Sequence, residues 1–243
     1  MAVHYDALDI NRDIRLDLPI REGIGTRTHS IARTKPLVTI VDTSGVWTIL
    51  DSYLGCITLD GVADYLWAPG ADTANLDFTS NEYSIAGWIY LGSGGASMSQ
   101  DLLSRFVLST NGWELYSYTN GFITMRHHHA ASLDPVSGNP RTGFYSAGWA
   151  FNAWYFLLLT RSGASGQFYR GTIDGTFGAV TTISDTLIDP ESCVSNLYIG
   201  CNNGATSNWH KGAFWRYRTW GDRALTLEEG GQIWEKEVEW FRS

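Results

Sequence analysis

Short segments in which apolar and polar residues alternate recur along most of the chain, and turn residues separate them. Near the start, Ile14, Leu16 and Leu18 alternate with Arg15 and Asp17, the period-2 pattern of a strand with one buried face. We predict strands at 13–20, 37–41, 45–49, 56–59, 64–67, 83–91, 102–109, 113–119, 122–127, 154–161, 166–173, 197–201 and 213–220. Because almost no helix lies between them, the pattern favours an antiparallel sandwich.

Two segments predict more about how the strands are arranged. The dipeptide Asn120-Gly121 separates two predicted strands, and this pair of residues is typical of a tight hairpin turn. The segment 154–159 reads WYFLLL and is apolar on both faces. A strand of that kind is covered on both sides, so we place it centrally in its sheet.

One helix is predicted at about 226–241. Thr226 and Glu229 have the spacing of a capping box, which satisfies free backbone donors at a helix start. Five residues then fall on one helical stripe: Leu227, Gly231, Trp234, Val238 and Phe241. We predict that the polar side holds Glu228, Glu235, Lys236, Glu237 and Glu239.

The chain of 243 residues reads as one domain, because it contains neither an internal repeat nor a linker. We expect an N-terminal arm at 1–13, followed by one sandwich over 14–243 that includes the helix. The net charge of −8 and the scarcity of Lys argue against nucleic-acid binding. The first residues lack the features of a secretory signal, and no apolar stretch is long enough for a membrane helix.

The order of several motifs resembles the laminin-G and pentraxin-like branch of the concanavalin A-like domains. The segments 59–66 (LDGVADYL), 83–90 (YSIAGWIY), 154–161 (WYFLLLTR) and 167–171 (QFYRG) are similar to successive strands of that family. The segments 197–200 (LYIG), 212–214 (GAF) and 223–229 (RALTLEE) are similar to its closing region. The resemblance covers about residues 14–234 and implies an all-β, antiparallel jelly roll with a concave face.

The resemblance also implies candidate sites. Related domains often hold calcium at the sandwich edge, and Asp60 and Asp64 are the matching carboxylates, although Asp60 could instead serve its turn with Gly61. The chain departs from the family where Trp215-Arg216 replace an acidic pair, and where the helix is extended. We expect these departures to form a partner interface made by Trp215, Arg216, Trp234, Val238 and Phe241.

The residues offer little support for catalysis. Glycan hydrolases of this fold class place two carboxylates on one strand, and no predicted strand has that pattern. Neither a nucleophile elbow nor a phosphate loop is present. His127 and His129 could share one face of a strand and ligate zinc, but a solvated strand end is favoured. We therefore expect no enzymatic activity and no cofactor other than calcium.

The three cysteines and the many aromatic residues each allow two interpretations. Cys193 and Cys201 could pair, but with Cys56 the chain holds three cysteines. This odd number favours buried free thiols over a disulfide. The chain holds 11 Trp and 12 Tyr, which either fill a core or stack on sugars. The glycan-binding candidates are four aromatics of predicted rim loops: Trp113, Tyr145, Trp149 and Trp209. For each of them, core or interface packing is the favoured alternative.

Three classes of function remain after these exclusions. We expect a structural surface component of a phage virion, such as a capsid decoration or a head- or tail-fibre module, located in the particle and assembled in host cytoplasm. Its partners would be the major capsid protein or another virion protein, further copies of itself, and a glycan. The alternatives are a lectin-like carbohydrate-binding module not tied to a virion, and a hydrolase. Unpaired cysteines suit assembly in a reducing cytoplasm.

Overall fold

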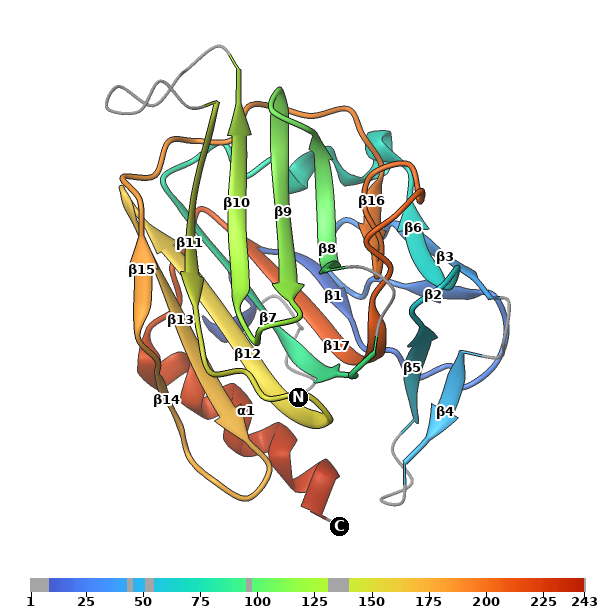
Figure 1. Ribbon diagram of the computed structural model, residues 1–243. Coiled ribbons are helices and arrows are strands. Elements are labelled where there is room, and N and C mark those ends of the chain that lie inside the picture. Colours follow the sequence, from blue (N-terminus) through green and yellow to red (C-terminus); the bar gives the residue numbers. More distant parts are fainter. Residues whose placement is uncertain (1–8, 43–45, 51–54, 95–97, 131–139, 243) are drawn as a thin grey trace, which may run out of the picture.

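The computed structural model describes residues 9–42, 46–50, 55–94, 98–130 and 140–242 (Figure 1). Residues 1–8 of the predicted arm lie outside this part of the chain. The described strands are β1 (Ile14–Leu18), β2 (Arg27–His29), β3 (Leu37–Val41), β4 (Trp47–Ile49), β5 (Gly55–Asp60), β6 (Tyr65–Ala68), β7 (Glu82–Leu91), β8 (Ser99–Val107), β9 (Asn111–Tyr118), β10 (Ile123–His129), β11 (Arg141–Ser146), β12 (Ala153–Ser162), β13 (Ser165–Thr172), β14 (Phe177–Ala179), β15 (Thr182–Ser184), β16 (Leu197–Ile199) and β17 (Lys211–Gly221). The described helices are η2 (Asp9–Asn11), η3 (Gly70–Leu76) and α1 (Leu227–Arg242).

The strands form two antiparallel sheets that pack face to face as a jelly-roll sandwich (Figure 1). Within the described residues, the eight-stranded sheet runs β14-β13-β12-β7-β17-β5-β4, with β1 paired to β17. The nine-stranded sheet runs β15-β11-β10-β9-β8-β16-β6-β3-β2. The predicted all-β fold, the β9–β10 hairpin and the two-sided burial of β12 are confirmed.

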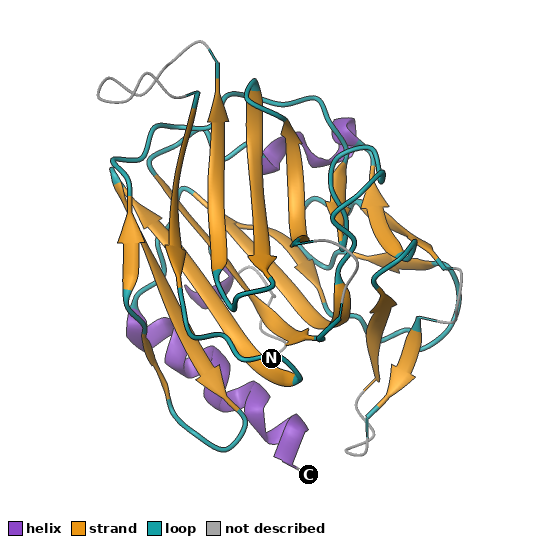
Figure 2. Cartoon of the chain, viewed as in Figure 1, coloured by secondary structure: helices purple, strands orange, loops and turns teal. Residues whose placement is uncertain are grey.

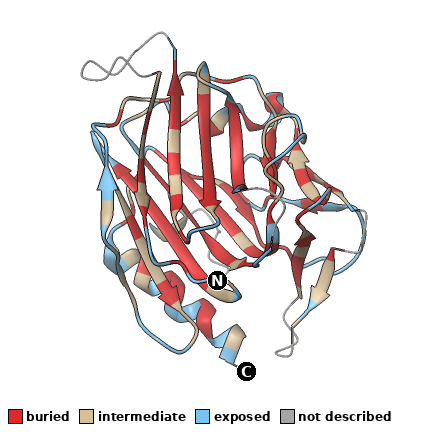
Figure 3. Cartoon of the chain, viewed as in Figure 1, coloured by how far each residue is buried: buried red, intermediate tan, exposed pale blue. Residues whose placement is uncertain are grey.

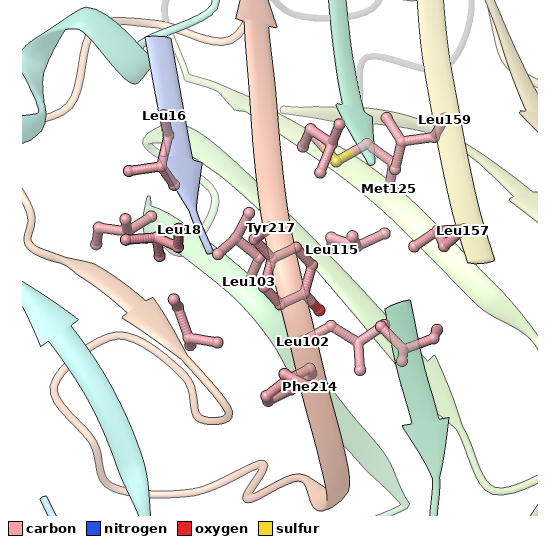
Figure 4. Close-up of a cluster of buried hydrophobic side chains, with 14 of the residues drawn as sticks. Leu16, Leu18, Leu102, Leu103, Leu115, Met125, Leu157, Leu159, Phe214 and Tyr217 are labelled. Carbon is pink, nitrogen blue, oxygen red and sulfur yellow. The ribbon is translucent and has the colours of Figure 1, made fainter. Parts of the chain in front are cut away.

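The core lies between the sheets because alternate residues of each strand point inward. Figure 4 shows this layer, in which Leu103, Leu115 and Met125 of the nine-stranded sheet meet Leu157 and Leu159 of β12. All five are fully buried. The other face of β12 is equally apolar and meets a second apolar cluster under helix α1. This second layer explains why 154–159 is apolar at every position.

Helix α1 lies against the outer face of the eight-stranded sheet (Figure 2). Its start is the predicted capping box: Thr226 N–H donates to Glu229 at 2.9 Å, and Glu229 N–H donates to the Thr226 hydroxyl at 3.2 Å. The predicted faces of the helix are wrong for two residues. Leu227, expected in the buried stripe, is 49% exposed, and Glu237, expected on the polar side, is buried. Glu237 accepts bonds from Trp88 at 3.1 Å and from Arg218, two residues of the sheet beneath.

The predicted partner interface is wrong for most of its residues, because they pack within the chain. Trp215, Trp234 and Val238 are buried between α1 and the eight-stranded sheet. Phe241 stacks on Trp88 with ring centroids 4.1 Å apart. Arg216 interacts with the carboxylates of Asp17 at 3.4 Å and Glu237 at 3.5 Å. These side chains hold the helix on its own sheet rather than forming a surface for another protein.

The described end of the predicted arm is fixed to the domain. Trp220 donates its indole N–H to the Ile10 carbonyl at 2.8 Å, and Arg223 donates to the Arg12 carbonyl at 3.1 Å. Residues 9–13 therefore belong to the sandwich and do not project from it. Figure 3 shows that burial is continuous along the central strands of both sheets, whereas the C-terminal turn of α1 carries exposed residues.

Candidate functional site

The outer face of the nine-stranded sheet presents polar and aromatic side chains where the inner face is apolar. On β9, Trp113 and Leu115 point into the core, while Glu114 and Tyr116 lie on the outer face. Strand pairing aligns the outer residues in rows, and one row runs across four strands: Tyr116, Thr124, Tyr145 and Ile183. The next row aligns Glu114, Arg126 and Gly143. Residues far apart in sequence therefore share one surface.

A groove of about 430 Å³ lies over these rows. It combines aromatic rings with charged and amide groups, and its lining includes Tyr116, Tyr118, Asn120, Phe122, Thr124, Arg126, Arg141, Thr142, Gly143, Tyr145 and Asp185. The Phe122 and Tyr145 rings pack with centroids 5.6 Å apart, and the Tyr116 and Tyr118 rings meet edge to face at 5.1 Å. Its size and mixed lining are those of a small-molecule site.

Local structure places each wall of this groove. The β9–β10 hairpin brings Tyr118 and Phe122 together, because Tyr118 N–H donates to the Phe122 carbonyl at 2.8 Å across the Asn120-Gly121 turn. Gly143 contributes backbone alone to the floor, and a Cβ there would lie 2.6 Å from the Met125 carbonyl oxygen. Asp185 accepts the Gly143 N–H at 2.9 Å, which holds its carboxylate at the groove.

Arg126 links the groove to a buried polar network beneath it. Its guanidinium lies 4.7 Å from the centre of the Tyr116 ring and donates to Glu114 at 2.9 Å. Glu114 also accepts from His128 at 3.3 Å. Burial raises the pKa of Tyr116 and lowers the pKa of His128. The cation is thus fixed in place at the bottom of the groove by a carboxylate and a ring.

Asp101 and Glu114 are carboxylates on neighbouring strands of this face, an arrangement that the search for a pair on one strand missed. Burial, with the nearby charge of Glu114, raises the pKa of Asp101 well above its usual range. However, Asp101 is fully buried and accepts from Asn208, and Glu114 is 4% exposed. Neither is among the described residues that line the groove, so neither is presented to a glycosidic bond.

The structure separates the four aromatic glycan candidates into two pairs. Trp113 and Trp149 are buried, and Trp113 donates its indole N–H to the Leu76 carbonyl at 2.6 Å. Both side chains therefore belong to the core and are not accessible to a glycan. Tyr145 is half-buried and lines the groove. Trp209 is also half-buried and packs on Tyr65, at the opposite end of the same sheet.

The histidine run is buried, so the expectation of a solvated strand end is wrong. His127 bonds with the Tyr83 hydroxyl and the Ile188 carbonyl, both at 2.7 Å. Burial and the charge of Arg161 lower the pKa of His127 to about 3. His129 contacts the Thr142 hydroxyl at 3.2 Å. Over the described residues, no three His, Cys, Asp or Glu side chains converge to hold a metal.

Asp60 and Asp64 sit at the turn after β5. The Asp60 carboxylate accepts the backbone N–H groups of Val62 at 2.8 Å and Ala63 at 3.2 Å. Asp64 is buried and accepts the Asp60 N–H at 3.3 Å. These bonds fit the turn role that the sequence offered as the alternative, and calcium binding here stays a prediction. The cysteines Cys56, Cys193 and Cys201 are free and buried.

Sequence reasoning missed most of the groove. The residues that it did not single out are Tyr116, Tyr118, Phe122, Arg126, Arg141 and Asp185. A signal was present in β9 and β10, where Glu114 and Arg126 alternate with apolar residues and so mark the outer face. Tyr116 and Tyr118 follow Glu114 by two and four residues, so they lie on the same face of the strand. That spacing indicates them, rather than Trp113, as the aromatic residues of the outer face.

No protein-family model and no curated protein matches the sequence. Solved structures, however, share its architecture. The fold is similar to that of botulinum neurotoxin receptor-binding domains. The serotype D receptor-binding domain matches with a TM-score of 0.67 and 11% identity, over 94% of this chain and 54% of that one.

Two further structures of this group were solved with a ligand or a protein partner. The serotype D ligand-binding domain in complex with N-acetylneuraminic acid has a TM-score of 0.64 and 12% identity, over 93% and 52% of the two chains. The serotype DC domain with rat synaptotagmin II has a TM-score of 0.63 and 12% identity, over 94% and 52%. The chain thus spans about half of each neighbour, and at this identity the likeness concerns the fold alone.

Proposed function

We propose that the chain is a non-catalytic glycan-binding module, and that its sugar lies in the groove over β9, β10 and β11. The observation that carries the proposal is the convergence of three partly exposed aromatic rings, those of Tyr118, Phe122 and Tyr145, with Arg126, Arg141 and Asp185 in one groove. A pyranose has a C–H face that packs on an aromatic ring, and hydroxyls that need donors and acceptors in fixed positions. The groove offers both within one small volume.

Structural neighbours add support at the level of the fold. Two of them were solved in complex with N-acetylneuraminic acid and with SialylT. The described helices of this chain include none long and apolar enough to span a membrane. The buried position of Asp101 and Glu114 supports the non-catalytic part of the proposal.

The test is a glycan array probed with the full chain, followed by titration calorimetry on the glycan that gives the strongest signal. Tyr145→Ala removes one ring of the groove wall, and we expect it to weaken binding at least about tenfold, the effect of losing one aromatic contact. Trp240→Ala is the matched control, because Trp240 is 57% exposed on helix α1, far from the groove. Its affinity should equal that of the wild type.

Trp209→Ala distinguishes the groove from the other aromatic candidate. Loss of binding in Trp209→Ala with full binding in Tyr145→Ala would move the site to the opposite end of the sheet. An array on which nothing binds would reject the glycan function. If chromatography shows that the bound glycan becomes shorter during incubation, the non-catalytic assignment is rejected.

The biological setting is a separate proposal, namely a virion surface protein held by the major capsid protein or another virion protein and by copies of itself. The free, buried cysteines support it, because a protein assembled in reducing cytoplasm needs no disulfides. Trp215, Trp234 and Val238 pack within the chain, so they do not support this setting as a surface for a partner. Mass spectrometry of purified particles tests the setting, and sedimentation tests self-association; a glycan-binding chain absent from particles would be a lectin not tied to a virion.

A further inference from the structure

A second hollow of about 670 Å³ adjoins the groove. The two share Phe122 and Tyr145, whose packed rings form a ridge between them. The rest of its lining comes from the segment after β11, from β13 and from β14, β15 and their connection: Ala147, Gly148, Arg170, Ala179, Val180, Thr181 and Ile183. Three segments far apart in sequence therefore converge beside the proposed sugar site.

The second hollow differs from the groove in its chemistry. Its side chains are mainly aliphatic, and Ile183 on β15 is 55% exposed. Together with the exposed Ala147 and Ala179, Ile183 gives the hollow an apolar surface that can pack on an apolar group of a ligand. Among the described lining residues, Arg170 is the one charged group. The groove, by contrast, contains Arg126, Arg141 and Asp185.

Arg170 is held in a fixed position. Its guanidinium lies 5.4 Å from the centre of the Trp149 ring and 5.7 Å from that of Tyr155, and it donates to the Gly148 carbonyl. A guanidinium has five N–H donors, so this contact leaves donors for an oxygen of a ligand. The buried Trp149 thus acts beneath the surface, by positioning the cation.

We propose that this hollow is a second sugar subsite that accepts a unit bearing an acetamido group, so that the ligand is an oligosaccharide spanning the Phe122–Tyr145 ridge. The acetamido methyl packs on Ala147, Ala179 and Ile183, and its carbonyl oxygen accepts from Arg170. A unit with a hydroxyl in place of the acetamido group leaves the aliphatic lining without an apolar partner. This inference rests on the proposed glycan function.

The experiment compares oligosaccharides matched except at C2, where one member carries acetamido groups and the other carries hydroxyls. The pairs are N-acetyllactosamine with lactose, which differ at one unit, and tri-N-acetylchitotriose with cellotriose, which differ at all three, each titrated against the full chain. In each pair that binds, we expect the acetamido member to bind about tenfold more tightly, as one buried methyl and one hydrogen bond contribute. Equal affinity within the pairs, or preference for the hydroxyl member, overturns the inference and leaves the glycan function standing.

Ala147→Asp tests the location of the subsite. Ala147 is exposed in the lining, so a carboxylate there is tolerated and competes for Arg170. We expect this variant to lose the acetamido preference but to keep the affinity for the hydroxyl member. Ala130→Asp is the control, since Ala130 is exposed after β10 and does not line either hollow. A preference that survives Ala147→Asp overturns the inference, and an absence of binding to any glycan overturns it together with the proposed function.

Discussion

Two histidines are fully buried, and burial fixes their protonation state. His127 lies between the Tyr83 hydroxyl and the Ile188 carbonyl. His210 is fully buried and stacks on Phe214 at 4.7 Å. Burial lowers the pKa of both histidines to about 3. Each stays neutral in the folded chain while the unfolded chain takes up a proton near pH 6.5, so acid favours unfolding.

The pH dependence of unfolding should therefore change when one of these histidines is removed. Because the folded pKa of His210 is lowered, its contribution is complete above about pH 6.5 and is lost as pH falls toward about 3. His210→Phe keeps the stack on Phe214 and cannot titrate. Urea unfolding at pH 7 and pH 5 should show that the wild type loses about 2 kcal/mol more than the variant. Parallel losses would contradict the assignment.

Asp101 should show the opposite dependence. Its pKa is raised by burial and by the charge of Glu114, so the folded chain holds a proton that the unfolded chain releases. The wild type then loses stability as pH rises above about 4 and through the folded pKa. Asp101→Asn imitates the protonated carboxyl. We expect it to be the more stable protein by about 1 kcal/mol at pH 8, with a smaller gain at pH 5, as measured by urea unfolding. A gain that is the same at both values would show that charge is not the cause.

At this scale the sequence revealed the kinds of residue but not their exposure. Trp113 was a glycan candidate, yet it shares parity with Leu115 and so points into the core. Tyr145 was another glycan candidate, and it is half-buried and lines the groove, so glycan binding by this ring stays a prediction. Asp185 could not have been found, because the loop that carries it reaches the groove through a bond to Gly143 on another strand. Alternation shows which residues share a face, whereas the fold decides which face meets solvent.

Among the elements, helix α1 shows how far pattern reasoning reaches. Its bounds and its capping box agree with the prediction. Its buried face does not, because Glu237 turns toward the sheet and bonds with Trp88 and Arg218. A helical stripe counts apolar residues alone and cannot register a carboxylate that pairs with cations on a distant strand. The strand β11 and the short strand β15 were missed for a related reason, since each is defined by its neighbour.

Glu237 should contribute more to stability than any exposed acid of the same helix. Glu237→Gln leaves Arg216 and Arg218 near Asp17 without their second carboxylate. Removing one partner of a buried ion pair costs about 3 kcal/mol, because a charge stays buried without compensation. Glu235→Gln is the matched control on the exposed side and should cost under about 0.5 kcal/mol. Urea unfolding compares the two, and equal effects would mean that the buried pair contributes nothing.

At the scale of the molecule, the two outer faces have different roles. Helix α1 covers the eight-stranded sheet with an aromatic layer that includes Trp88, Phe156 and Trp234. The nine-stranded sheet carries the groove and the second hollow. One outer face is thus apolar where the helix packs on it. The other is polar and aromatic where we propose that a ligand binds. The sequence predicted both sheets and placed the helix in the same domain, but it assigned Trp234, Val238 and Phe241 of the helix to a partner interface rather than to packing on the sheet.

Removing the helix should expose the layer beneath it. A chain ending at Thr226 leaves Trp88, Phe156 and Trp215 without a cover, an apolar patch of the kind that causes association. We expect this chain to bind anilinonaphthalene sulfonate strongly and to sediment as large assemblies. A chain ending at Phe241 is the control, because it keeps the buried side of α1 and should behave as the full chain does. If the shorter chain instead sediments as a single species and binds no dye, the helix is not the cover of this sheet, and its residues would again be candidates for an interface with another protein.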